Sequence, residues 1–288
     1  MSKIFDDIKL QYKLGDITNK IIYWNVGVFV LSLVLFFRFT EYRFVYPNWL
    51  ALSSNPENFL IFPWTFFTYA FLHSGFWHLF FNMLMLNFSG RLFLTYFTQK
   101  QFVGLYVLSA IFAGLTFAIS YFLMGISAPI VGASAAVLSI LVATTAYQPL
   151  MEVRLLLIGN VKLWHLTAVI LLLDIMQILV ENTGGHISHI AGAVFGVMYM
   201  KLLQNGTDLS NIVTKVINFF VNLFQPKKSV PFKKVHVNNT KSSTSTKSKI
   251  VIKDKTQQQI DEILDKIGQS GYDSLTAEEK EFLFKAGK

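Results

Sequence analysis

The stretch FVGLYVLSAIFAGLTFAISYFLM, residues 102–124, decides the fold class of this 288-residue chain. It holds no charged side chain, and as an α-helix it would be about 35 Å long, which exceeds a hydrocarbon core of about 30 Å. The whole chain is 53% hydrophobic and 15% charged, whereas soluble domains contain about 25% charged residues. The sequence therefore predicts an all-α membrane protein and excludes disordered, collagen-like and disulfide-rich classes for most of the chain.

Five more apolar runs accompany this one. The six candidate spans are residues 21–37, 77–97, 102–124, 131–147, 163–180 and 187–203. The fourth would be only about 24 Å long as a helix, so we expect it to begin below the membrane surface and to leave a water-accessible hollow above it. The first loop, residues 39–76, is long and rich in aromatic residues, and we expect it to lie in the membrane interface and partly re-enter the bilayer.

Lysine and arginine are distributed unevenly along the chain, whose formal net charge is +8. They occur in residues 1–20, after the second and fourth spans and throughout the tail, but are missing from loops 125–130 and 181–186. By the positive-inside rule, both termini should be cytoplasmic. The positive charge thus follows from membrane topology and does not predict a nucleic-acid partner.

The chain is expected to divide into four parts. Residues 1–20 form a cytoplasmic N-terminal segment, 21–204 a six-helix domain, 205–255 a basic flexible linker, and 256–288 a short helical hairpin. The linker is rich in Lys, Ser and Thr without an apolar period, which is typical of a segment that cannot form a packed core.

The predicted hairpin rests on two local signals. Apolar side chains recur at the spacing of an amphipathic helix, and they are Ile260, Ile263, Leu264 and Ile267. Gly268 should end this helix, and Thr276 with Glu279 forms a capping box that opens a second one. The sequence names no partner for this tail.

Six polar side chains fall inside or next to the apolar spans, where such residues are costly and usually functional. They are His78, Asn82, Ser134, Asp174, His186 and His189. His78 and Asn82 lie one turn apart on one helix face, which also suits an ordinary interhelical hydrogen-bonding pair. Asp174 and His186 are interpreted as structural, and His73, just upstream, as interfacial. No metal is predicted, because the histidine spacing matches no established site and the chain has no cysteine.

Ser134 and His189 are the candidates for chemistry. Ser134 opens the short fourth span, where unpaired backbone N–H groups and the helix dipole favour a developing negative charge. His189 precedes Gly192 and Gly196, a spacing that lets two helix backbones approach closely. The small residues at the same spacing on the fourth span are Gly132 and Ala136. If these faces meet, His189 reaches Ser134 and can act as the base that activates it.

Three segments carry most of these residues in a fixed order. They are HSGFWHLFFNMLMLNFSG (73–90), VGASAAV (131–137) and SHIAGAVFG (188–196). Together they resemble the motifs of rhomboid intramembrane serine proteases, and the resemblance covers about residues 20–204. It implies a six-helix rhomboid-like bundle of bacterial type with a membrane-embedded first loop. It also implies that the fifth helix of the bundle is the lateral gate for substrate.

The resemblance also implies a role for each matching residue. Ser134 would be the nucleophile and His189 the general base, in a dyad with no evident third acid. His78 and Asn82, with the backbone N–H of Ser134, would stabilise the oxyanion. Three glycines would permit this packing, and they are Gly132 in the turn before Ser134 and Gly192 and Gly196 on the sixth span.

The predicted function is an intramembrane serine endopeptidase that cleaves single-span membrane proteins within the lipid bilayer of a bacterial inner membrane, without a cofactor. Two alternatives stay open. One is a rhomboid-like protein that binds membrane segments without cutting them. The other is a small-solute transporter that uses Asp174 and the histidines as a proton relay. Transporters often contain a repeat between their halves, and none is evident between residues 20–110 and 111–204.

Overall fold

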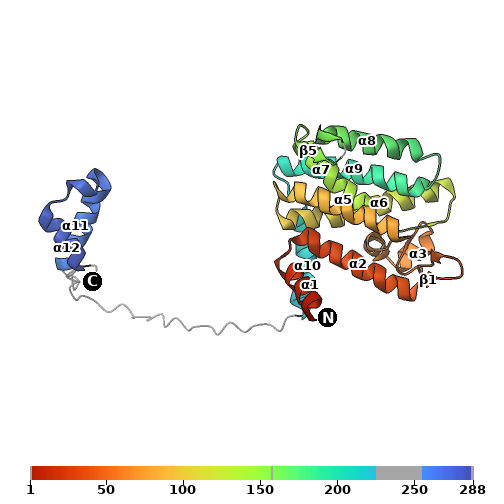
Figure 1. Ribbon diagram of the computed structural model, residues 1–288, viewed down its shortest axis with the longest axis horizontal. Coiled ribbons are helices and arrows are strands. Elements are labelled where there is room, and N and C mark those ends of the chain that lie inside the picture. Colours follow the sequence, from red (N-terminus) through yellow and green to blue (C-terminus); the bar gives the residue numbers. More distant parts are fainter. Residues whose placement is uncertain (1, 157, 225–254, 287–288) are drawn as a thin grey trace, which may run out of the picture. The chain divides into compact units, whose positions relative to one another are not determined.

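The computed structural model describes residues 2–156, 158–224 and 255–286, and these residues are mostly helical (Figure 1). The chain forms two compact units, Met1–Lys227 and Lys228–Lys288, and each is described by itself. The predicted helical class is thereby confirmed in its main part for the described residues, which also contain three short two-stranded sheets.

Each predicted span overlaps a helix, with the ends shifted by up to four residues. The six helices are α2 (Ile17–Leu35), α5 (Phe76–Leu94), α6 (Gln99–Met124), α7 (Ser134–Tyr147), α8 (Leu163–Gln177) and α9 (Thr183–Gln204). Within the described part of the chain, α2, α6 and α9 are long and apolar enough to cross a membrane, and α7 and α8 are shorter apolar helices. Several apolar helices of this kind fit a multi-pass membrane protein.

Helix α7 forms the centre of the first unit. Residues 135–144 are all buried, as expected for a helix that is apolar on every side. It is packed against α5, α6, α8 and α9, while α2 packs on α5 at the far side of the bundle (Figure 1). Because four helices pack against α7, they together fix the position of its first residue, Ser134.

The start of α7 differs from the prediction. Gly132 has a backbone φ of +138°, which favours glycine, and its N–H donates to the Tyr69 carbonyl oxygen at 3.0 Å. Just before it, β4 (Pro129–Ile130) pairs with β3 (Leu52–Ser53). The helix therefore begins at Ser134 rather than 131, and α7 has only 14 residues.

Two glycines bring α9 against α7. A Cβ on Gly192 would overlap the Ala135 carbonyl oxygen, and one on Gly196 would overlap that of Ser139. The close approach predicted for these glycines is therefore present, but the predicted partner face was wrong. The partners predicted from spacing were Gly132 and Ala136. Gly132 lies in a turn outside the helix and is not part of the face that meets α9. The face that meets α9 contains Ala135 and Ser139 instead.

The first loop is a folded layer beside α6. It contains β1 (Phe37–Arg38), β2 (Arg43–Phe44), α3 (Pro56–Ile61), α4 (Thr65–Thr68) and the 3₁₀-helix η1 (Tyr69–Phe71). The buried Tyr69 hydroxyl donates to the Ala110 carbonyl oxygen on α6 at 2.8 Å. On the outside, Trp64 is half exposed and donates its Nε1–H to the Trp49 carbonyl oxygen at 2.8 Å. The loop is thus held to α6 by the Tyr69 hydrogen bond and has an exposed tryptophan on its outer side.

The remaining elements of the first unit lie at its ends. They are α1 (Ser2–Leu14), the antiparallel hairpin of β5 (Glu152–Leu155) and β6 (Gly159–Lys162), and α10 (Ser210–Phe224). The sequence predicts a flexible linker over 205–255, but α10 occupies part of this range and packs on α6, with Ser210 against Gly104. The difference arises because apolar residues such as the buried Val213 recur within that stretch. Residues 225–254 of the predicted linker lie outside the described residues.

The second unit contains the predicted helical hairpin. Its elements are α11 (Lys255–Ser270), η2 (Tyr272–Ser274) and α12 (Ala277–Ala286). The Thr276 N–H donates to Glu279 Oε2 at 2.7 Å, and the Glu279 N–H donates to Thr276 Oγ1 at 3.3 Å, which is the predicted capping box. Lys266 on α11 forms an ion pair with Glu279 at 2.8 Å. Helix α11 passes the predicted stop at Gly268 and ends at Ser270.

Candidate active site

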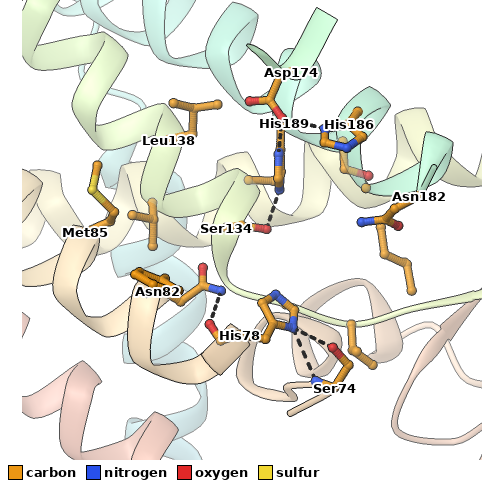
Figure 2. A pocket seen from close by; sticks show the side chains of 18 of the residues that line it. Ser74, His78, Asn82, Met85, Ser134, Leu138, Asp174, Asn182, His186 and His189 are labelled. Atoms are coloured by element: carbon orange, nitrogen blue, oxygen red, sulfur yellow. Dashed lines mark hydrogen bonds and ion pairs between the residues drawn. The ribbon is translucent and has the colours of Figure 1, made fainter. Parts of the chain in front are cut away.

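A pocket of about 740 Å³ is lined by residues of α5, α7, α8 and α9. It lies at the end of the bundle where α5, α7 and α9 begin, because residues of their first turns line it. Figure 2 shows its polar side chains, and the predicted site residues are among them. A pocket at the beginning of three helices is surrounded by helix N-termini, whose dipoles favour negative charge.

Ser134 and His189 meet inside this pocket. The Nε2 atom of His189 lies 2.6 Å from the Ser134 Oγ (Figure 2), so the predicted contact is present. The geometry follows from the glycine packing, since Gly192 is three residues after His189 on the same side of α9 and touches Ala135, the neighbour of Ser134. A serine hydroxyl in contact with an imidazole is the arrangement of an activated nucleophile and its base.

A third polar group joins this pair. Asp174 Oδ1 lies 2.7 Å from the Nδ1 atom of His189 and 2.6 Å from that of His186 (Figure 2). The sequence suggested no partner for Asp174, and the geometry corrects this. Helical spacing could have indicated that Asp174 is buried, because Asp174 and Thr167 share the buried face of α8, but it does not identify the neighbouring helix.

His78 lies on the other side of Ser134. Its ring contacts Gly132, whose added Cβ would lie 3.0 Å from His78 Nε2 and 3.5 Å from Ser134 Oγ. The backbone N–H of Ser74 donates to His78 Nδ1 at 3.2 Å, and the Ser74 hydroxyl lies 2.9 Å from the same atom. Because Nδ1 accepts, a neutral His78 carries its proton on Nε2, which faces the reaction centre. Ser74, which sequence reasoning missed, precedes His78 by one helical turn.

Asn82 also lines the pocket and is 6% exposed. Its side-chain amide donates to the His78 carbonyl oxygen at 2.8 Å, so one amide N–H is occupied and the other is left for a ligand. His73, expected to be interfacial, is instead fully buried, with its ring 5.1 Å from that of His78. The two rings pack edge to face, with an angle of 67° between their planes.

Asp174, His186 and His189 also form a group that could hold a metal ion. Their ligand atoms all lie within 4.8 Å of one another, and imidazole with carboxylate is a common ligand set. In the described geometry, however, both Nδ1 atoms bind to the carboxylate, and His189 Nε2 binds to Ser134. A metal would have to break these hydrogen bonds, so the arrangement suits acid–base chemistry better.

Taken together, the pocket contains the parts of an acyl-transfer site. Ser134 offers a hydroxyl next to an imidazole that can act as a base, and its own backbone N–H is one of the unpaired donors at the start of α7. His78 Nε2–H is a second donor on the same side. Two donors beside a nucleophile can bind the oxyanion of a tetrahedral intermediate.

Comparison with known families adds two matches. Residues 62–205, which are half of the chain, match the profile of a family described as Rhomboid domain. Residues 251–285 match a family of unknown function, DUF6576, and the described part of this range corresponds to α11, η2 and most of α12. No curated protein was found to be similar to the chain.

Proposed function

The chain belongs to the rhomboid family, and from this premise we propose that it is an intramembrane serine endopeptidase. Ser134 is the nucleophile and His189 the general base. The substrates are single-span membrane proteins, which are cleaved within their transmembrane segments. The observation that carries the proposal is the 2.6 Å contact between Ser134 Oγ and His189 Nε2 at the head of α7.

The reaction follows from this geometry. Ser134 Oγ attacks the scissile carbonyl carbon while His189 Nε2 takes the hydroxyl proton. The oxyanion is bound by the Ser134 backbone N–H, by His78 Nε2–H and by the free amide N–H of Asn82. Collapse of the intermediate expels the amine, which receives the proton from His189. A water molecule, deprotonated by His189, then releases the acyl chain and restores Ser134.

The position of the pocket supports the access of water that the second step of the reaction requires. Helix α7 has 14 residues and is about 21 Å long, shorter than the hydrocarbon core. Its first residue therefore lies below the membrane surface, and the pocket above it is a route for water. Residues of α8 also line this pocket, and we propose α8 as the lateral gate because its outward side chains, such as Leu172 and Ile175, are exposed.

The proposed topology has six spans and both termini in the cytoplasm of a bacterial cell. Under this topology the site lies near the non-cytoplasmic surface, where the loops 125–130 and 181–186 carry no lysine or arginine. The first loop, with Trp49 and Trp64 partly exposed, lies in the membrane interface, where tryptophan is favoured.

Cleavage is tested with the full chain in liposomes that also contain a single-span substrate. The parent should cut the substrate, while Ser134→Ala and His189→Ala should not. A fluorophosphonate probe should label Ser134, which is identified by mass spectrometry of the modified peptide. The matched control is Ser139→Ala, the same substitution in the same helix at a fully buried position outside the pocket, and it should keep activity.

Each result separates the candidate functions. Cleavage by Ser134→Ala would disprove the assignment of the nucleophile. A parent that retains the substrate but neither cuts it nor reacts with the probe would be the non-proteolytic binder. A parent that does neither, but carries protons or solute in a manner that depends on Asp174, would be the transporter.

A further inference from the structure

Asp174 makes contacts that a Ser134–His189 dyad does not need. We propose that Asp174 is a positioning residue, whose carboxylate holds His189 in the tautomer and orientation in which Nε2 can take the proton of Ser134. This inference rests on the proposed function. It extends the pair to a triad whose members come from three helices, α7, α8 and α9.

The hydrogen-bond inventory supports this assignment. An ionised carboxylate only accepts hydrogen bonds, so the 2.7 Å contact between Asp174 Oδ1 and His189 Nδ1 requires the proton to be on Nδ1. In a neutral imidazole, Nε2 then carries the lone pair. That atom is the one 2.6 Å from Ser134 Oγ. The carboxylate therefore selects the tautomer that makes His189 a base, and it would stabilise the imidazolium formed during the reaction.

His186 holds the carboxylate in place. Its Nδ1 lies 2.6 Å from the same Asp174 Oδ1, and its ring is perpendicular to that of His189, with centroids 5.7 Å apart. Both contacts have the length of charge-assisted hydrogen bonds. Because two donors from α9 share one oxygen, the Asp174 side chain cannot turn away without breaking both contacts.

The location of Asp174 on α8 argues against a purely incidental contact. The buried residues of this apolar helix are Leu163, Thr167 and Asp174. A carboxylate at this depth is costly unless it is matched, and the two histidines match it. Thr167, two helical turns before Asp174 on the same buried face, pairs with Thr145 of α7 at 2.7 Å. Since Asp174 belongs to α8, His189 is aligned only while α8 packs against α9.

The test uses Asp174→Asn in the full chain, with Thr167→Val as the matched control. Asparagine keeps the size of the side chain but removes its charge. It should lower kcat by about 10²–10⁴-fold, as in serine proteases that lose this group, and leave KM unchanged. Thr167→Val removes the side-chain contact between α8 and Thr145 of α7 without touching His189, and kcat should not change.

A spectroscopic measurement tests the positioning directly. In ¹⁵N-histidine-labelled protein, the His189 signals are identified by their loss in His189→Gln. They should report a protonated Nδ1 and an unprotonated Nε2 in the parent, and a mixed or reversed tautomer in Asp174→Asn. If Asp174→Asn does not fold, the spectrum of the parent protein is sufficient for the test. A His189 that is protonated at Nε2 in the parent overturns the inference.

Two further outcomes overturn it: an unchanged kcat in Asp174→Asn, or an equal loss in Thr167→Val, which would mean that Asp174 merely anchors α8. The proposed function fails separately, if the parent does not cleave and Ser134 is not labelled. In that case the NMR comparison still tests whether Asp174 sets the tautomer of His189.

Discussion

Replacing Gly192 by alanine should push α9 away from α7 and disable the site. The added Cβ would overlap the Ala135 carbonyl oxygen and lie 2.9 Å from the carbonyl carbon and 3.2 Å from the Cα of Ala135. These are backbone atoms of a buried helix, so they cannot rotate aside as a long side chain would. The clash must therefore be relieved by separating the helices.

The size of the effect follows from these distances. Carbon atoms in contact lie about 3.5–4.0 Å apart, so the 2.9 Å contact requires a shift of about 0.6–1 Å. The Ser134 Oγ to His189 Nε2 distance of 2.6 Å would then rise to about 3.2–3.6 Å, at or beyond the limit of a hydrogen bond. Overpacking of this kind costs about 1–3 kcal/mol of stability, and a misplacement of about 1 Å at reacting groups lowers the rate about 100-fold.

The assay measures kcat in liposomes and the unfolding temperature in detergent. The matched control is Gly27→Ala on α2, where an added Cβ meets nothing within 4 Å. It should leave kcat unchanged and stabilise the helix slightly, since alanine favours helix more than glycine. If Gly192→Ala cleaved as fast as Gly27→Ala and unfolded at the same temperature, the α7–α9 contact would not be what aligns the pair.

Three more predictions follow from single contacts. Asn82→Ala should lower kcat without lowering the unfolding temperature, because the amide is proposed to bind the oxyanion; an unchanged cleavage rate would remove it from that role. Ser74→Ala keeps the backbone donor to His78 but removes the hydroxyl 2.9 Å away, so kcat should fall less than in His78→Ala, and an equal loss would contradict this order. In the tail, the hydrogen bonds from Lys266 hold the pKa of the Glu279 carboxyl below its usual value. The stabilisation is therefore present above the ordinary carboxyl pKa and lost as pH falls through the lowered one. Hydrogen exchange of α11 and α12 in the full chain should report this loss in the parent, and Lys266→Met should weaken the dependence on pH.

Local patterns were sufficient to identify the helices and the two central residues. Runs without charge predict membrane helices because an unpaired charged group inside the bilayer is costly. Ser134 is indicated by its place at the start of the short fourth span, and His189 by its place before Gly192, which makes the close contact with α7 expected of it. Helix α10 was missed, since the basic and polar composition of 205–255 hid the short apolar repeat that packs on α6.

Local sequence patterns do not predict which helix faces contact each other. Spacing along α8 indicates that Thr167 and Asp174 share a face, but it does not say which neighbour that face meets. The rotation and crossing of α8 and α9 bring Asp174 within 2.7 Å of His189, and these depend on contacts between residues far apart in the chain.

The sequence by itself thus determined that the protein is helical and apolar, and that Ser134 and His189 are its candidates for chemistry, because these properties depend on hydrophobicity and motif. Only the tertiary structure decided that Ala135 and Ser139 form the face for the glycines of α9, that Ser74 contacts His78, and that Asp174 contacts His189. The physical reason is that a hydrogen bond between helices depends on distances of a few tenths of an ångström, which are set by packing against α7 and not by local spacing.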